Sequence, residues 1–193
     1  MNFNALLVST GVVAFAELGD KTQLLAIVLA ARFRAPVAVI LGILAATTVN
    51  HTLAAWVGTY IGEWLGQNLS WILAISFIAM GLWTLLPDKL DGEPKVTEKW
   101  GAFGATAVSF FLVEMGDKTQ LATMALAARY DAVVTVAIGT TLGMMIADVP
   151  AVYLGEVAAK RLPLKLMRTI AAIIFLLLGL AALLDWGRRF VFA

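Results

Sequence analysis

The 193-residue chain contains no cysteine and only one histidine. Disulfide bonds and thiolate metal sites are therefore excluded, and zinc and copper, which normally recruit cysteine or histidine, are poor candidates as bound metals. Charged residues are also scarce, at 14% of the chain, against roughly 25% in soluble proteins. Hydrophobic residues make up 61%. This composition excludes an ordinary soluble domain and indicates a membrane protein.

The apolar residues fall into six segments, each near the ~20 residues that a helix needs to cross a bilayer. We predict membrane spans at 4–31, 36–62, 70–87, 101–128, 132–158 and 166–186. Few residues remain outside these spans. The sequence therefore predicts an all-α membrane protein with six transmembrane helices and no soluble domain.

An internal repeat divides the chain into two halves. Residues 17–42 and 114–139 align without a gap and are identical at 15 of 26 positions. Each half holds three predicted helices, an odd number, so the second half must enter the membrane from the opposite side. We therefore predict two inverted-topology repeats, residues 1–87 and 101–193, joined by a polar cytoplasmic linker at 88–100.

Basic residues are distributed unequally between the two sides of the predicted membrane. One side collects nine, and the other collects Arg129, Arg188 and Arg189. Because positively charged loops stay in the cytoplasm, we expect a cytoplasmic linker and both termini outside. The nine residues are Arg32, Arg34, Lys89, Lys95, Lys99, Lys160, Arg161, Lys165 and Arg168.

One polar motif occurs in both halves, at 17–23 (ELGDKTQ) and again 97 residues later at 114–120 (EMGDKTQ). Each charged residue at the centre of a membrane helix costs about 2.5–3.5 kcal/mol, so a doubled motif of this kind indicates a binding site. On a continuous helix the acids at i and i+3 share one face, with the glutamine one step further. The predicted ligands are Glu17, Asp20, Gln23, Glu114, Asp117 and Gln120.

Carboxylate and amide oxygens are the ligands of hard cations such as Ca²⁺, Mg²⁺ and Mn²⁺. Four acids and two lysines in the motifs leave a formal charge of −2, which one divalent ion neutralises. The ion is expected as a transported substrate, and no cofactor is predicted.

The other motif residues allow more than one interpretation. Lys21 and Lys118 either neutralise the glutamate four positions earlier or act in gating, and Thr22 and Thr119 are nearby hydroxyl donors. The glycine inside each motif serves either close helix packing or a local break of the helix.

Three further polar residues fall in predicted spans. His51 and Asp148 occupy equivalent positions of the repeat, and Asn50 precedes His51. An acid inside a membrane span is functional by default, and histidine can exchange protons near neutral pH. We consider Asp148, His51 and Asn50 as a possible proton relay, with interface hydrogen bonding as the alternative for His51.

The doubled Glu-x-Gly-Asp-Lys-Thr motif, in the first helix of each three-helix half, resembles the GDT1 family, also called UPF0016. The resemblance covers essentially the whole chain. It implies secondary transport of Mn²⁺ or Ca²⁺ out of the cytosol in exchange for protons, with Glu17, Asp20, Glu114 and Asp117 as the acidic residues of the motif. The short chain resembles bacterial members, which implies manganese export at the inner membrane.

Other functions remain as alternatives. Ca²⁺/H⁺ exchange could be the main activity, and rings of acids also line passive cation channels. An intramembrane enzyme is disfavoured, since the chain offers paired acids but no nucleophile or histidine-based metal site. The expected partners are a divalent ion, protons and the lipid bilayer, without nucleic acid or an obligate protein partner.

Overall fold

The computed structural model describes residues 2–86, 100–161 and 164–191, and for 155–161, 164 and 185–191 it describes the backbone alone. Helices form all of the regular structure in these residues. The all-helical prediction is confirmed for these residues. Residues 88–99 of the predicted linker lie outside them. The helices are α1 (Phe3–Glu17), α2 (Lys21–Phe33), α3 (Pro36–Leu65), the 3-10 helix η1 (Gly66–Asn68), α4 (Leu69–Thr84), α5 (Gly101–Glu114), α6 (Lys118–Tyr130), α7 (Val133–Arg161) and α8 (Leu164–Val191).

The predicted spans 4–31 and 101–128 are wrong as continuous helices. Each is two helices separated by a three-residue break, between α1 and α2 and between α5 and α6. Gly19 and Gly116 lie in these breaks at φ +81° and +79°, a conformation that glycine adopts without the steric cost borne by other residues. Of the two roles that the sequence allowed for these glycines, the structure therefore shows the helix break.

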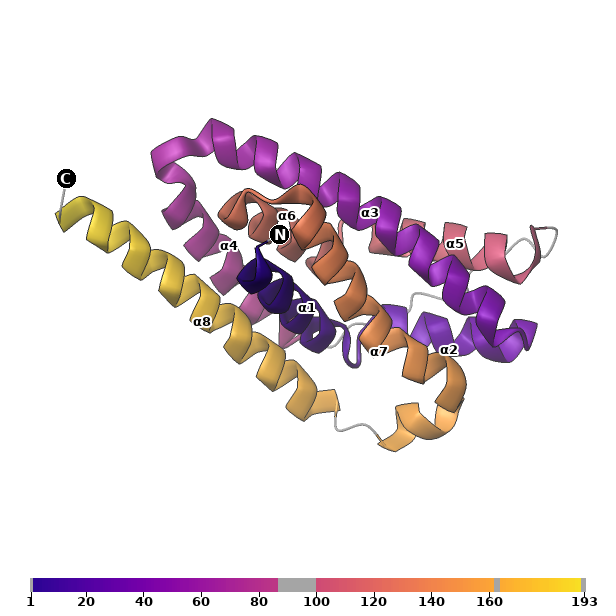
Figure 1. Ribbon diagram of the computed structural model, residues 1–193. Helices are drawn as coiled ribbons and strands as arrows, with labels where there is room; N and C mark the ends of the chain where they lie inside the picture. Colours follow the sequence, from indigo (N-terminus) through magenta and orange to yellow (C-terminus); the bar gives the residue numbers. More distant parts are fainter. Residues whose placement is uncertain (1, 87–99, 162–163, 192–193) are drawn as a thin grey trace.

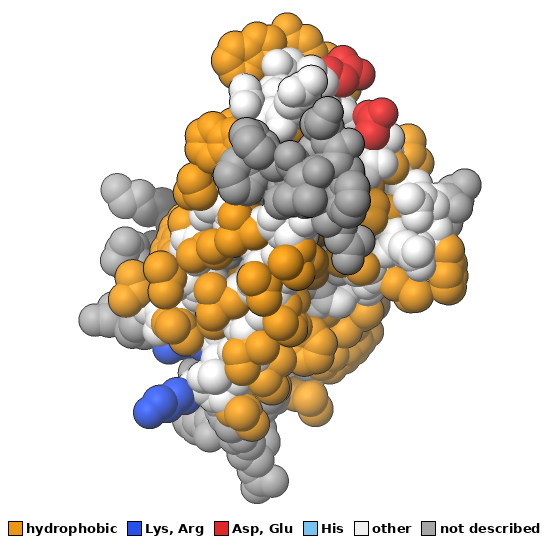
Figure 2. All heavy atoms as spheres, turned by 90° about the vertical axis from the view of Figure 1, so that its left-hand side faces the viewer, with side chains coloured by type: hydrophobic (Ala, Val, Ile, Leu, Met, Phe, Trp, Pro, Cys, Tyr) orange, Lys and Arg blue, Asp and Glu red, His pale blue; other side chains and the backbone are white. Residues whose placement is uncertain are grey.

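The other four predicted spans correspond to α3, α4, α7 and α8. By length and composition, three helical segments in the described part of the chain can cross a membrane, at Pro36–Thr84, Val133–Leu154 and Lys165–Leu184, and the first of these contains both α3 and α4. The helices α1 and α5 are apolar but shorter. Apolar side chains cover most of the described surface in Figure 2, as expected for a surface in contact with lipid.

The two halves are interleaved rather than side by side (Figure 1). Helix α1 packs on α7 of the other half, α5 packs on α3, and α4 packs on α8. Glycines at equivalent repeat positions permit the close approach: a Cβ at Gly42 would lie 2.7 Å from the Thr106 side chain, and one at Gly139 would lie 2.9 Å from the Ser9 side chain. Small residues at such contacts are typical of membrane helices.

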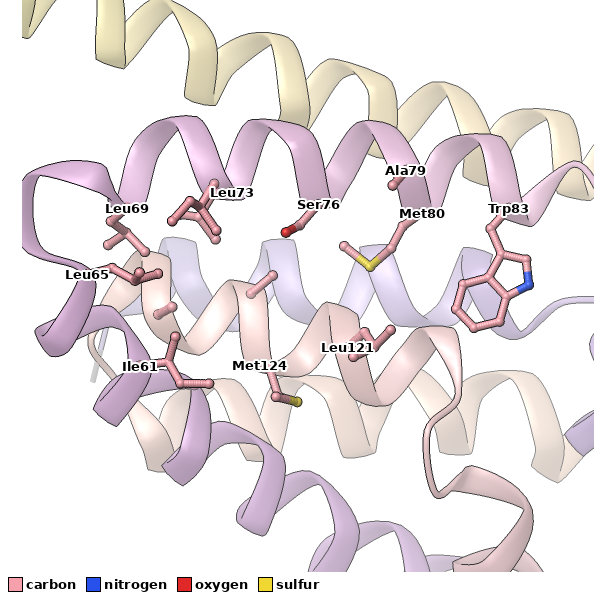
Figure 3. Close-up of a pocket in the computed structure, with 14 residues that line it drawn as sticks. Ile61, Leu65, Leu69, Leu73, Ser76, Ala79, Met80, Trp83, Leu121 and Met124 are labelled. Carbon is pink, nitrogen blue, oxygen red and sulfur yellow. The ribbon is translucent and has the colours of Figure 1, made fainter.

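An apolar pocket of about 360 Å³ lies between α3, α4 and α6 (Figure 3). Its walls include Ile61, Leu73 and Met124, and Ser76 and the indole of Trp83 are the polar groups in its lining. No carboxylate lines this pocket. It therefore offers no charged ligand to a cation.

The contact between α3 and α6 gives a first prediction. A Cβ at Gly58 would lie 2.2 Å from the Met124 carbonyl oxygen, so we expect Gly58→Ala to destabilise the protein by about 1–3 kcal/mol, the usual cost of overpacking. Thermal unfolding in detergent measures the change. Gly11→Ala in α1 is the matched control because nothing lies within 4 Å of its added Cβ. Equal melting temperatures for the two variants would contradict the close approach.

Candidate metal centre

The two helix breaks meet inside the protein and bring the acids of both motifs together. Glu17 and Glu114 end α1 and α5, and Asp20 and Asp117 immediately precede α2 and α6. All four side chains are buried, with at most 2% of any residue exposed. One carboxylate oxygen each from Glu17, Glu114 and Asp117 lies within 4.8 Å of the other two. The structure thus brings together the acids that the sequence singled out, although by the ends of broken helices rather than by one helical face.

Both lysines form ion pairs across the boundary between the halves. The Lys21 Nζ lies 2.8 Å from Asp117 Oδ1, and the Lys118 Nζ lies 2.9 Å from Asp20 Oδ1. The sequence-based alternative paired each lysine with the glutamate four residues earlier on the same helix. The break removes that spacing, because Glu17 and Lys21 now belong to different helices, and each ammonium group instead reaches the aspartate of the other half.

The two glutamines form hydrogen bonds with the backbone of the helix breaks. Gln23 Oε1 accepts a hydrogen bond of 2.9 Å from the Gly19 backbone N–H, and Gln120 Oε1 accepts one of 2.7 Å from Gly116. The backbone N–H groups freed by the break thereby find hydrogen-bond partners. Both amide oxygens, which the sequence predicted as metal ligands, are engaged in these hydrogen bonds in this structure.

The same amides tie each break to the long helix of the other half. Gln120 Nε2 donates to Asn50 Oδ1 in α3 at 2.7 Å, and Gln23 Nε2 donates to the Ala147 carbonyl oxygen in α7 at 3.1 Å. Asn50 and Ala147 are equivalent positions of the repeat. The Ala147 contact was missed by sequence reasoning, because a backbone acceptor leaves no trace in residue identity. The sequence signal that could have indicated this contact is the repeat, because Ala147 lies 97 residues after Asn50 at the equivalent position.

The threonines hold the glutamates of their own halves. The Thr22 hydroxyl donates to Glu17 Oε2, and the Thr119 hydroxyl donates to Glu114 Oε2 at 3.1 Å. Each bond occupies one oxygen of the carboxylate. The other oxygens, Oε1 of Glu17 and of Glu114, are buried and have no hydrogen-bond partner among the described residues.

Asp148 and His51 complete the cluster from α7 and α3. Asp148 is fully buried, interacts electrostatically with both glutamates, and has no hydrogen-bond partner for either oxygen within the described structure. His51 is also fully buried, and its Nε2 lies 3.9 Å from Glu114 Oε2. The two residues singled out as equivalent positions of the repeat thus reach the same cluster.

The chemistry of this donor set fits a hard divalent cation. The cluster holds five buried carboxyl groups, and lysines pair with two of them, Asp20 and Asp117. A buried carboxylate without a counter-charge is costly unless a cation or proton joins it. Oxygen ligands without thiols suit Mn²⁺, Ca²⁺ or Mg²⁺. The five acids are Glu17, Asp20, Glu114, Asp117 and Asp148.

Comparison with known proteins identifies the family. The model of the family described as "Divalent cation/proton antiporter GDT1" matches the chain twice, at residues 5–92 and 102–189. No solved structure is detectably similar to the chain.

Curated relatives agree with this match. A protein of Vibrio cholerae serotype O1 named "Putative manganese exporter" is 48% identical over 180 residues, covering 92% of this chain and 90% of that protein. A GDT1-like protein of Synechocystis is 30% identical over 92% of this chain and 94% of its own length. GDT1-like protein 3 of Arabidopsis thaliana is 27% identical over 90% of this chain and 68% of its own length. The chain belongs to the GDT1 family, whose members are membrane transporters and not enzymes.

Proposed function

We propose that this protein exports Mn²⁺ from the cytoplasm in exchange for protons, through one buried site shared by its two halves. The observation that carries the proposal is the convergence of carboxylates from both motifs on one point, with oxygens of Glu17, Glu114 and Asp117 within 4.8 Å of one another. The family description supports proton-coupled transport of a divalent cation. The name of the Vibrio cholerae relative supports manganese as the cation.

The proposed topology has six spans in two inverted repeats. Helices α1 and α2 together form one broken span, and α5 with α6 form its counterpart, while α3, α4, α7 and α8 cross individually. The two separate matches of the family model support the repeat. Broken helices that meet near the middle of the membrane are a recurring design of secondary transporters. By the charge distribution, both termini lie outside the bacterial inner membrane and the linker lies in the cytoplasm.

The site residues take distinct roles in this proposal. Ionised carboxylates of Glu17, Asp20, Glu114 and Asp117 bind the metal ion, and the threonines orient the glutamates. Gln23 and Gln120 act by holding the breaks in place, with their amide oxygens as possible further ligands when the loops rearrange. Lys21 and Lys118 balance charge. Asp148, His51 and Asn50 form the route for protons beside the metal ligands.

Exchange follows from the chemistry of the carboxylate. A carboxylate binds a cation when it is ionised and loses that capacity when a proton occupies it. Protons that enter from outside therefore compete with the metal for the same oxygens. Rocking of the two halves around a fixed site would then expose it alternately to the two sides.

Ca²⁺ is the second candidate substrate. The family description specifies a divalent cation, and the oxygen donors of the site suit both ions. Cavity size and ligand number decide between them. A passive channel is disfavoured, because the family is described as one of antiporters.

Neutralising one acid tests the shared site. Glu17→Gln keeps the shape of the side chain and breaks neither lysine pair, so we expect a folded protein that no longer protects manganese-sensitive cells lacking other exporters. Asp117→Asn should do the same while also leaving Lys21 without its partner. Glu63→Gln is the matched control, since Glu63 is exposed on α3. Full protection by the Glu17 variant, at equal membrane abundance, would contradict the proposal.

Transport in inverted membrane vesicles tests the coupling. We expect a pH gradient, acidic inside, to drive Mn²⁺ accumulation against its own gradient, and an uncoupler to abolish it. Vesicles containing the Glu17→Gln variant provide the baseline. A channel could only dissipate a metal gradient, so accumulation that ignores the pH gradient would rule out exchange. Competition by Ca²⁺ in the same assay ranks the two ions.

A further inference from the structure

The two lysine pairs differ in accessibility although the motifs around them are the same. The Lys118–Asp20 pair is buried on both sides, with side chains 3% and 0% exposed. In the Lys21–Asp117 pair the aspartate is equally buried, at 2%, but the lysine side chain is 25% exposed. The Lys118–Asp20 pair is thus inaccessible to solvent, whereas the Lys21–Asp117 pair reaches the surface of the protein through Lys21.

The loop beside Asp117 shows the same difference. Met115 and Gly116 are exposed, whereas at the equivalent positions Leu18 is half-buried and Gly19 is buried. A charged side chain exposed to lipid is costly, so the partial exposure of the Lys21 side chain beside the exposed loop fits a route for water on this side. That route leads to the side of the site formed by Lys21 and Asp117.

Helix packing leaves the same side less covered. Helix α4 packs on α6, and α8 packs on α1. Over the described residues, α4 has no comparable packing on α5, nor α8 on α2. The uncovered helices, α2 and α5, are those that supply Lys21 and lead into the Asp117 loop.

Lys21 also competes directly with a metal ion for one carboxylate. Asp117, and not Asp20, belongs to the group of three acids whose oxygens lie within 4.8 Å of one another. Its Oδ1 is held by the Lys21 ammonium group at 2.8 Å. A cation that takes Asp117 as a ligand must therefore share that oxygen with Lys21 or displace it.

We propose that Lys21 is a tethered cation, which holds Asp117 while no metal is bound and moves away when a divalent ion enters from the accessible side. Lys118 stays paired with Asp20 during this step, so the entering ion is bound by Glu17, Glu114 and Asp117. Asp20 becomes a ligand only when the site opens to the other side. This role rests on the proposed function and deepens it. Lysine suits it because its charge is compact and its four-carbon stem is flexible. The exchange also avoids leaving a buried carboxylate without a counter-charge, which is strongly destabilising.

Chemical labelling of the purified protein tests the displacement. We expect a water-soluble amine reagent to modify Lys21 about tenfold faster with saturating Mn²⁺ than without metal, since close charge pairs are coupled by energies of that size. Lys118 should stay unmodified in both states, and the exposed Lys165 provides the reference rate. Peptide mass spectrometry reads out all three sites. Lys21 labelling that Mn²⁺ leaves unchanged or lowers would overturn the proposal.

Binding measurements on variants provide the second test. Lys21→Gln removes the competitor and should lower the Kd for Mn²⁺ about tenfold, whereas Lys21→Arg keeps a competing charge and should stay near the wild-type value. Lys165→Gln is the surface control. A merely structural Lys21 predicts weaker Mn²⁺ binding by Lys21→Gln, which would overturn the tethered-cation role. A lower melting temperature without metal is expected under either role, because Asp117 loses its partner.

The binding measurements distinguish a failure of the proposed function from a failure of the proposed role of Lys21. Wild-type protein that does not bind Mn²⁺ would overturn both. Wild-type binding that Glu17→Gln abolishes but that Lys21→Gln leaves unchanged would retain the shared site and overturn the role of Lys21 alone.

Discussion

Burial of charge is the constraint on which the rest of this structure depends. Five acids and Lys118 lie within an apolar helical protein with almost no exposed area, and removing one partner of such a buried pair typically costs about 3–5 kcal/mol. The two lysine–aspartate pairs run between the halves, so each aspartate forms its ion pair with a lysine of the other half. The halves are thereby tied together at the point where the proposed exchange requires them to move.

The helix breaks make this crossed arrangement possible. In a continuous helix Lys21 would lie one turn from Glu17 and neutralise it locally. The break at Gly19 ends that relation, frees Lys21 to reach Asp117, and leaves Glu17 with one oxygen bonded to Thr22 and the other without a hydrogen bond in the described structure. It also exposes a backbone N–H, which Gln23 satisfies. The residues between Glu17 and Gln23 thus supply ligands to the proposed cation site and also satisfy a backbone group at the helix break that they create.

Much of this site could be predicted from the sequence, because charge inside an apolar segment and a repeat at fixed offset are visible in residue identity. The four motif acids, His51 and Asp148 were all found in this way. The partners of the lysines could not be predicted, since they depend on how two helix breaks face each other in space. The sequence also could not decide whether the motif glycine breaks the helix or permits close helix packing, because glycine suits both roles. The Ala147 carbonyl has no signature in its side chain.

The repeat is not strict, and two of its differences lie at the site itself. Where the first half carries Asn50 and His51, the second carries Ala147 and Asp148. If the two halves were identical in sequence, the protein would have two equivalent conformations in which Lys21 and Lys118 exchange roles. Neither conformation would then be favoured. Here Gln120 at one break donates to the Asn50 side chain, and Gln23 at the other donates to a backbone carbonyl. The second half also carries an acid where the first carries a histidine. If the protein alternates between two states as proposed, these four positions bias it toward one of them, and a bound cation or proton would supply the free energy that shifts it to the other.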